Sequence, residues 1–265
     1  MTRRKKTILS CLTAVLIAIP VLAYVYLVFP LWGMPFNAQR HGNPPLTPAW
    51  ALECWLWEDD VNKAEFVDEL LQGYAQHDIP VRTVIIDSPW SKRYNDFMID
   101  PNLYPEPWFA KVQDQGYRVV LWMTSMVNSH NKDLERRDSQ MWFEQAKRKG
   151  YLAAKGGQNK WWKGKGGFID YSNPEAMQWW HGLQQRVFDL GIDGWKLDGT
   201  ATLFWQQLGP IPIFYRRTPS GLMTTRTYMD HYYRNEYKHG LTQHPEFVTL
   251  SRSLDRAFPP ESVAP

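Results

Sequence analysis

The sequence predicts an α/β fold built on a parallel β-sheet. Short runs rich in β-branched and aromatic residues, such as residues 81–87 (VRTVIID) and 117–123 (YRVVLWM), have the composition of buried strands. Apolar side chains at helical spacing separate such runs, as Phe66, Leu70 and Tyr74 do before the first of these two. Strands that alternate with helices are typical of βα units, and either a doubly wound sheet or a (β/α)8 barrel accommodates them.

Capping and stop signals define the clearest helix. Asn173 is expected to cap its N-terminus, Pro174 suits the first helical position, and Gly191 ends it. Residues 156–167 are rich in Gly and Lys and predict a loop. In chain order the expected elements are strand 50–57, helix 62–76, strand 81–87, helix 107–115, strand 117–123, helix 142–149, the loop, helix 174–190, strand 192–198, helix 228–238 and strand 246–250.

The first 36 residues have the pattern of a signal anchor. Residues 3–6 are all basic, and the 22 residues from Ile8 to Phe29 carry no charge, a length that spans a bilayer as a helix. Basic residues before the helix and none just after it predict a cytoplasmic N-terminus and an extracytoplasmic body. Because the apolar run continues to Trp32 without a small-x-small site, a single-pass membrane anchor is favoured over cleaved secretion. The predicted domains are residues 1–36 for the basic stub and transmembrane anchor, 37–48 for a linker and 49–265 for the body.

Composition argues against several function classes. Beyond residue 36 the chain carries 26 basic and 27 acidic side chains, so it lacks the broad positive field that nucleic-acid binding needs. Cys11 and Cys54 form no CxxC motif and the histidines show no H-x-x-x-H spacing, so we expect no protein-held metal and no cofactor. The 14 Trp residues suit a core, and their faces also suit stacking on sugars.

Three predicted strands lead into a carboxylate. Asp87 closes VRTVIID, Asp170 follows a short apolar pair, and Asp198 closes GIDGWKLD. The carboxyl ends of parallel strands form the active-site edge in both candidate architectures, although a lone Asp there also serves as a helix cap or a loop ion pair. Lys196 lies two residues before Asp198 on the same strand face, and its ammonium group favours an ionised carboxylate, as a nucleophile requires.

These segments resemble glycoside hydrolase family 31, the α-glucosidase and α-xylosidase group. The strongest match is residues 191–198, GIDGWKLD, which is similar to the G-x-D-G-x-K-x-D strand of the family. The other matches follow in family order and are Ile79-Pro80 with Ile86-Asp87, the loop from Asn95 to Tyr104, residues 168–176 (FIDYSNPEA) with Trp179-Trp180, and residues 250–253 (LSRS).

The resemblance implies an incomplete (β/α)8 TIM-type barrel, made of about the first five βα units, over residues 49–265. It also implies a retaining glycosidase that acts on the O-glycosidic bonds of an α-linked carbohydrate, with Asp198 as the nucleophile. The implied substrate-binding residues are Asp87, Asp170, Lys196 and Arg252.

Two departures from the family pattern bear on activity. The residues after Asp198 are Gly199, Thr200 and Ala201, which leaves the subsite preference open. The W-x-G-D segment that carries the general acid/base of the family does not follow LSRS in this sequence, so Asp170, Asp230 and Asp255 are the candidates for that role. We therefore expect that a longer coding unit or a second chain completes the barrel, or that the chain is a homologue that has lost turnover.

Two further functions fit the same residues. A membrane-anchored, non-catalytic sugar-binding homologue would keep Asp87, Lys196 and Arg252 without turnover. A Schiff-base lyase would instead use Lys196 as its nucleophile, because barrel strands also carry such lysines.

Overall fold

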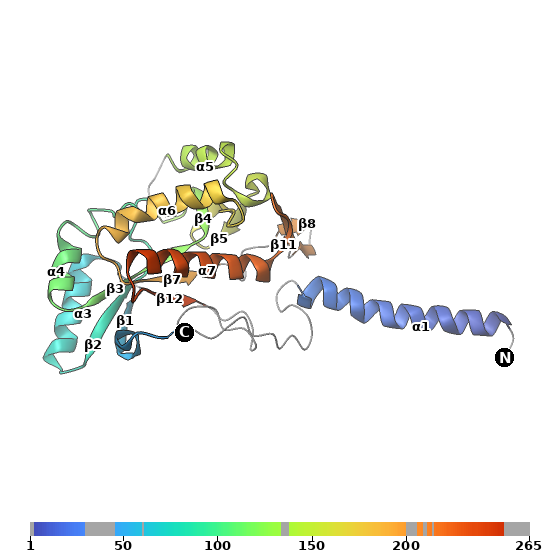
Figure 1. The fold of residues 1–265 in the computed structure, drawn as a ribbon, viewed down its shortest axis with the longest axis horizontal. Coiled ribbons are helices and arrows are strands. Elements are labelled where there is room, and N and C mark those ends of the chain that lie inside the picture. The colour runs from blue at the N-terminus through green and yellow to red at the C-terminus, as the bar shows by residue number, and fades with distance from the viewer. Residues whose placement is uncertain are drawn as a thin grey trace.

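A five-stranded parallel sheet forms the centre of the structure (Figure 1). The computed structural model describes residues 3–29, 46–59, 61–133, 138–199, 206–208, 211–213 and 215–251 of the chain. The strands follow the chain in the order β1 (Cys54–Glu58), β2 (Val81–Ile86), β3 (Arg118–Thr124), β7 (Gly194–Asp198) and β12 (Val248–Ser251), each parallel to its neighbours. A doubly wound sheet reverses its strand order at a switch point, whereas a barrel wall keeps the sequential order found here.

Helices connect the successive strands. The side chain of Asn173 accepts the backbone N–H groups of Glu175 at 3.0 Å and Ala176 at 3.4 Å, so the predicted cap ahead of Pro174 is confirmed. Figure 1 shows two of the connecting helices on the left of the sheet and two above it. These helices are α3 (Ala64–Gln76), α4 (Trp108–Asp114), α6 (Pro174–Phe188) and α7 (Thr225–Gln243).

Alternation along the strands divides the core between the two faces of the sheet. Val84, Leu121 and Trp195 pack against the helices in the larger hydrophobic cluster. Ile85 and Val120, their neighbours along β2 and β3, belong to a separate cluster on the other face, which also contains Trp50, Ala51 and Val248. Because side chains alternate along a strand, Asp87, Lys196 and Asp198 project from this second face.

A second, antiparallel sheet is inserted between β3 and α6. It consists of β4 (Met126–Asn131), β5 (Asn159–Trp161) and β6 (Gly164–Phe168), with β6 in the middle, and α5 (Ser139–Arg148) and the 3-10 turn η3 (Ala153–Gly156) lie between β4 and β5 along the chain. The expected loop at 156–167 is therefore wrong. A Cβ atom on Gly166 would lie 2.5 Å from the carbonyl oxygen of Val127, so here glycine permits close strand pairing.

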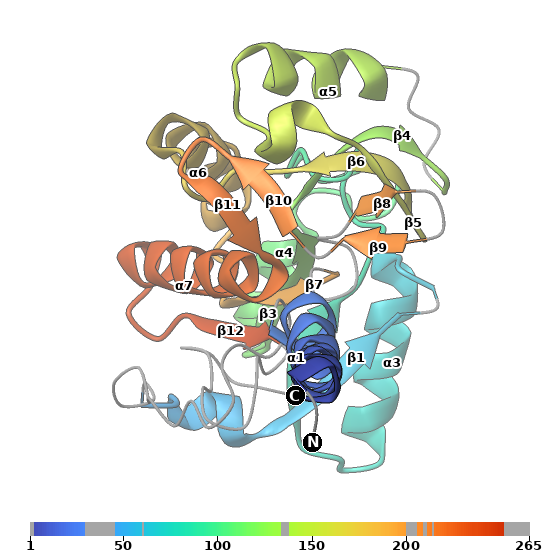
Figure 2. The same ribbon diagram turned by 90° about the vertical axis from the view of Figure 1, so that its right-hand side faces the viewer.

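Several other bounds differ from expectation. The first strand begins only at Cys54, because a 3-10 turn, η2 (Ala49–Leu52), occupies the start of the expected segment. α7 begins three residues earlier than expected, where the Thr224 hydroxyl caps the backbone N–H of Thr227 at 3.1 Å. Two short hairpins, seen in Figure 2 around the end of α1, precede α7. Their strands are β8 (Gln206–Leu208), β9 (Ile211–Ile213), β10 (Tyr215–Thr218) and β11 (Gly221–Thr224).

An apolar helix extends from the body at the N-terminal end (Figure 1). α1 (Arg3–Ala23) continues as a π-helical turn, η1 (Tyr24–Val28), and none of these residues is buried. The 26 residues are long and apolar enough to cross a membrane, a test that a signal sequence also passes. The Tyr215 hydroxyl donates to the carbonyl oxygen of Val25 at 2.7 Å, so the end of this helix contacts β10.

A buried carboxyl joins α6 to α7. Glu236 on α7 is fully buried and accepts hydrogen bonds from Trp180 Nε1 at 2.9 Å, from Gln184 Nε2 at 2.7 Å and from the Tyr171 hydroxyl. Burial raises the pKa of Glu236 to about 7. Three donors converge on one acceptor, which fixes the spacing of the two helices behind the sheet.

Candidate active site

Asp87 and Lys196 form an ion pair on the second face of the sheet. Nζ of Lys196 lies 2.5 Å from Oδ2 of Asp87, and the two side chains are 14% and 6% exposed. Asp87 directly follows β2 and Lys196 lies on β7, with β3 between these strands. Adjacent strands are about 4.8 Å apart, so the two side chains meet across an intervening strand, which a concave sheet face permits.

Trp57, at the end of β1, completes the surroundings of this pair. Its indole N–H donates to Oδ2 of Asp87 at 2.8 Å, and Nζ of Lys196 lies 3.7 Å from the centre of its ring. An ammonium group over an indole face is a cation–π contact. Trp57 remains 54% exposed, so one side of the ring is open to a ligand. Sequence reasoning missed this residue, because a strand Trp has the same composition signal as a core Trp.

Asp198 closes β7, two residues beyond Lys196. Its Oδ2 accepts the indole N–H of Trp122 at 3.1 Å, and its Oδ1 accepts the backbone N–H of Gly199 at 2.8 Å. In the register of the sheet, Trp122 is opposite Lys196 and Thr124 is opposite Asp198. Two donors therefore hold the carboxylate on the face that carries the ion pair.

The inserted sheet supports Trp122 from behind. The Trp161 ring on β5 stacks parallel to the Trp122 ring, with 6.2 Å between centres, and Tyr94 contacts both rings edge-on. The Trp161 indole N–H donates to Asn128 Oδ1 at 2.9 Å, which ties the stack to β4. The orientation of Asp198 thus depends on a sheet that the sequence analysis interpreted as a loop.

A further carboxyl that the sequence analysis missed follows β1. The pKa of Asp59 is raised, first by partial burial and then by the negative charge of Asp87, while Lys196 and Lys163 lower it. Asp59 therefore belongs to the same group of interacting charges. The sequence signal was a carboxylate at the end of a strand, the same signal that marked Asp87.

Asp170 makes its hydrogen bonds to a residue close to it in the sequence. It is 1% exposed, and its Oδ1 accepts the backbone N–H of Ser172 at 3.0 Å and the hydroxyl of the same residue. The strand before it, β6, belongs to the antiparallel inserted sheet, so the expectation that Asp170 follows a strand of the parallel sheet is wrong. Its predicted contact with substrate stays a prediction.

The remaining predicted residues lie elsewhere. Asp230 accepts Nε of Arg234 at 2.7 Å one turn along α7, as in a common helix ion pair. Arg252 and Asp255 lie outside the described residues. Within the part of the chain that the structure describes, no group of three His, Cys, Asp or Glu residues is placed to hold a metal ion.

Two curated proteins with related sequences are α-xylosidases. An α-xylosidase of Emericella nidulans is 29% identical over 167 residues, which cover 59% of this chain and 20% of that protein. An α-xylosidase of Lactiplantibacillus pentosus is 28% identical over 171 residues, which cover 60% of this chain and 21% of that protein. The chain thus corresponds to about a fifth of the length of these relatives.

Solved structures share the fold. A dextranase of Flavobacterium johnsoniae in complex with glucose superposes with a TM-score of 0.70 at 19% identity, covering 82% of this chain and 28% of that one. A cycloalternan-degrading enzyme of Trueperella pyogenes superposes with a TM-score of 0.66 at 22% identity, covering 83% of this chain and 34% of that one. Residues 44–254 match the family described as "Glycosyl hydrolases family 31 TIM-barrel domain". The chain belongs to glycosyl hydrolase family 31, and the match is to the TIM-barrel domain of that family.

Proposed function

We propose that the chain carries the nucleophile side of the active site of a retaining α-glycosidase, with Asp198 as the nucleophile. The observation that carries the proposal is the placement of the Asp198 carboxylate. It lies at the carboxyl end of β7, held by the N–H groups of Trp122 and Gly199, on the sheet face that bears the Asp87–Lys196 pair. The carboxyl ends of barrel strands are where catalytic groups of this architecture act.

The first step follows from the chemistry of the carboxylate. A carboxylate oxygen of Asp198 attacks the anomeric carbon through an oxocarbenium-like transition state, and the glycosidic oxygen leaves with the electron pair of the broken bond. Water then displaces the carboxylate and releases the sugar. The donor of the proton to the leaving oxygen is not assigned, since the described candidates Asp170 and Asp230 sit in a local turn and in a helix ion pair.

Asp87, Lys196 and Trp57 have the chemistry of a sugar subsite. The Asp87 carboxylate can accept hydrogen bonds from sugar hydroxyl groups, and the Lys196 ammonium group can donate hydrogen bonds to sugar oxygens. The open face of Trp57 offers a surface for the C–H groups of a pyranose ring. Their mutual contacts fix these side chains before a ligand arrives, which lowers the entropy cost of orienting a sugar. Arg252 is proposed to contact the same sugar. The relatives named α-xylosidase favour an α-linked substrate.

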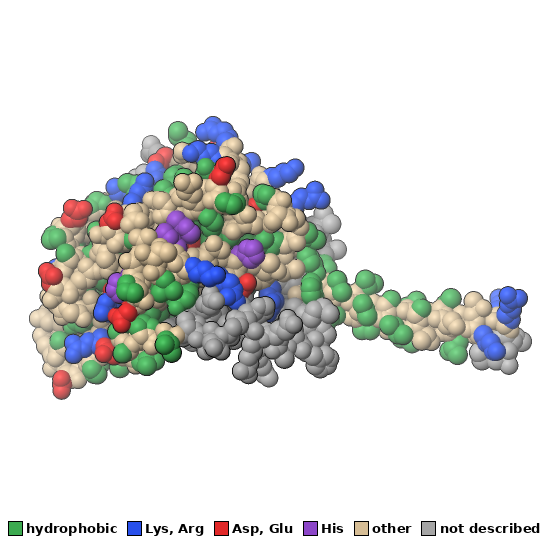
Figure 3. Space-filling view, viewed as in Figure 1, with side chains coloured by type: hydrophobic (Ala, Val, Ile, Leu, Met, Phe, Trp, Pro, Cys, Tyr) green, Lys and Arg blue, Asp and Glu red, His purple; other side chains and the backbone are tan. Residues whose placement is uncertain are grey.

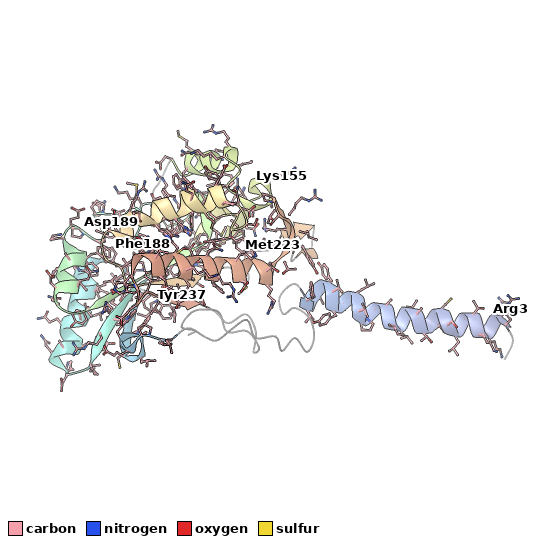
Figure 4. All side chains as sticks on the ribbon, in the orientation of Figure 1. Arg3, Lys155, Phe188, Asp189, Met223 and Tyr237 are labelled. Atoms are coloured by element: carbon pink, nitrogen blue, oxygen red, sulfur yellow. The ribbon has the colours of Figure 1, made fainter. Side chains whose placement is uncertain are left out.

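A trapping experiment tests Asp198. Incubation of the full chain with an activated α-glycosyl fluoride is expected to give a covalent adduct on Asp198, because a fluoride leaving group needs little protonation. Asp198→Ala should remove the adduct. Asp189→Ala is the matched control, since Asp189 lies at the end of the body away from α1 (Figure 4). An adduct that survives in Asp198→Ala contradicts the assignment.

Turnover distinguishes the enzyme from a sugar-binding homologue. General acid catalysis contributes about 10²–10⁴-fold, so the chain alone is expected to hydrolyse α-linked disaccharides poorly. The non-catalytic alternative is favoured if the unmodified chain forms no adduct and Asp198→Ala still binds sugar.

The Schiff-base lyase is less favoured, because Lys196 makes two contacts that suit an ammonium cation. Borohydride labelling of Lys196 with a carbonyl substrate would overturn that order.

We further propose that α1 is a single-pass membrane anchor with the body on the extracytoplasmic side. Support comes from the apolar length of α1 and from the basic residues that precede it. Deleting residues 1–36 is expected to move the body from the membrane fraction to the soluble fraction. If expression of the full sequence instead gives soluble protein with a new N-terminus near residue 30, cleaved secretion is favoured.

A further inference from the structure

The outward face of the inserted sheet carries a row of basic side chains. In the register of the three strands, His130 on β4 is opposite Lys165 on β6, and Lys165 is opposite Lys160 on β5. Residues directly opposite each other in an antiparallel sheet project from the same face. All three residues are exposed. We call these three residues the basic row.

The other face of the same sheet is buried and supports the active site. Trp161, one residue after Lys160, is 9% exposed and stacks on Trp122, the donor to Asp198. Trp162, the next residue, is 46% exposed and contacts Trp161 edge-on with 5.2 Å between ring centres. An accessible aromatic ring therefore lies against the Trp pair behind the candidate nucleophile, two residues after Lys160 in the chain.

The basic row does not stabilise the fold. Like charges directly opposite each other across strands are destabilising. The strands β4, β5 and β6 contain no Asp or Glu, and Lys160 and Lys165 form no ion pair with any residue that the structure describes. Lys163, in the turn between them, differs because its Nζ lies 2.9 Å from Oδ2 of Asp133. The paired lysine has a structural role that the two unpaired lysines lack.

We propose that the basic row and Trp162 bind an anionic polysaccharide, a chain of sugars that carries carboxylate or sulfate groups. Ammonium groups on adjacent strands lie about one strand spacing apart, so they meet several negative charges of an extended chain. The exposed indole supplies a stacking surface for a sugar ring. Figure 3 shows further Lys and Arg side chains over the upper part of the body, where α5 and the inserted sheet lie.

A polysaccharide is favoured over other polyanions by two observations. The body beyond residue 36 has 26 basic and 27 acidic side chains, so the positive charge is local and does not form the broad field that nucleic acid requires. Trp162 also connects the surface to the active-site side of the sheet through Trp161. The choice of a carbohydrate rests on the proposed function, whereas the choice of an anion rests on the basic row alone.

Binding to defined polymers tests the proposal. The full chain in neutral detergent would be titrated with polygalacturonate, dextran sulfate and neutral dextran by calorimetry at low and high salt. We expect the charged polymers to bind more tightly than dextran, with an affinity that falls as salt rises. Lys160→Gln combined with Lys165→Gln should weaken this binding at least tenfold. Trp162→Ala should weaken it without changing its salt dependence.

A matched variant controls for total charge. Arg82→Gln combined with Lys238→Gln removes two exposed positive charges elsewhere on the body and should leave the affinity unchanged. The proposal is wrong if the lysine variant binds like the unmodified chain, or if neutral dextran binds as tightly as the charged polymers. It is also wrong if vesicles of phosphatidylglycerol or duplex DNA bind through these lysines while both charged polysaccharides do not.

The same variants separate this proposal from the proposed function. The lysine variant should still form the Asp198 adduct with an α-glycosyl fluoride, because neither lysine contacts Asp198 or Trp122. Polymer binding by an unmodified chain that forms no adduct would refute the glycosidase proposal and leave the anion-binding surface. Adduct formation by a chain that does not bind the charged polymers would refute the anion-binding surface and leave the glycosidase proposal.

Discussion

The indole N–H of Trp122 donates to Oδ2 of Asp198 at 3.1 Å, although the two residues belong to different strands. The donor fixes one carboxylate oxygen, and the inserted sheet fixes the donor through the Trp161 stack. The position of the candidate nucleophile is therefore determined by three separate segments of the chain, β3, β5 and β7.

Removal of this donor is expected to slow the reaction of Asp198. Trp122→Phe keeps an aromatic ring against Trp161 and deletes the N–H group. A hydrogen bond to a charged group contributes about 1.5–3 kcal/mol, so labelling by an α-glycosyl fluoride should slow by roughly 10- to 100-fold. Trp108→Phe is the matched control, because it deletes an N–H bond to Asp68 away from the site. Equal labelling rates in Trp122→Phe and the unmodified chain would show that the bond does not orient Asp198.

The Asp87–Lys196 pair should be strongly coupled. Removing one partner leaves a poorly solvated charge, so Asp87→Asn and Lys196→Gln are each expected to lower the free energy of unfolding by about 3 kcal/mol. The double variant should lose less than the sum, with a coupling of about 1–3 kcal/mol in urea unfolding. Lys111 and Asp68 form the exposed comparison pair, at 50% and 32% exposure, and should couple by less than about 1 kcal/mol. Additive losses for Asp87 and Lys196 would contradict the contact.

Glu236 should make the fold less stable as the pH rises. Its pKa is raised to about 7 by burial, so the folded state holds a proton that the unfolded state releases near pH 4.5. Stability from this group is complete below pH 4.5 and is lost as the pH rises through 7. Between pH 5 and 8 the unmodified chain should lose about 2–3 kcal/mol relative to Glu236→Gln, measured by urea unfolding at each pH.

The Gln variant is suited to this measurement. Oε1 of Gln184 is buried without a hydrogen-bond partner among the described residues. If the Gln184 amide flips in the Glu236→Gln variant, this oxygen can accept a hydrogen bond from the side-chain NH2 group at position 236. Glu236→Ala should be destabilising at every pH, because it strands the N–H groups of Trp180 and Gln184. Parallel pH profiles for the unmodified chain and Glu236→Gln would show that Glu236 does not titrate in this range.

A stacked histidine pair between α6 and α7 should make the fold less stable as the pH falls, the opposite of the effect of Glu236. The rings of His181 and His239 are parallel, with 3.8 Å between centres, and burial lowers their pKa values to about 3 and about 4. As the pH falls below about 6.5, these histidines become protonated in the unfolded state but stay neutral in the folded state. The stability that they contribute is therefore complete above pH 6.5 and is lost as the pH falls toward the two lowered pKa values.

Replacing both rings should remove this acid sensitivity. Between pH 7 and 5 the unmodified chain is expected to lose up to about 2 kcal/mol per histidine relative to His181→Leu combined with His239→Leu. Partial exposure of the rings reduces this value. His77→Leu, at the exposed end of α3, is the control and should keep the pH profile of the unmodified chain. Equal acid sensitivity in the double variant would assign the effect to other groups.

Sequence reasoning succeeded where the signals are local. The runs at β2 and β3 are rich in β-branched residues, and the Asn173 cap of α6 is a short-range hydrogen bond. Alternation along one strand correctly placed Lys196 and Asp198 on the same face, and the parallel sheet brought Asp87 to Lys196.

It failed where pairing between distant segments decides the structure. The strand at residues 164–168 reads GKGGF, a composition of loops, and only its pairing with β4 and β5 makes it a strand. Trp57 and Trp122 were missed because a Trp that orients a carboxylate has the same sequence signature as a core Trp such as Trp195. Asp59 lacked any family motif.

The two outer strands of the parallel sheet have a practical consequence for preparing the protein. β1 and β12 each pair with one neighbour among the described strands, so during folding the other side of each presents backbone N–H and C=O groups until its remaining contacts form. Such borders recruit any other extended segment that they meet during folding. Recovery of soluble chain is therefore expected to fall as its concentration during refolding rises, and dilution should favour single copies over fibrous or amorphous by-products.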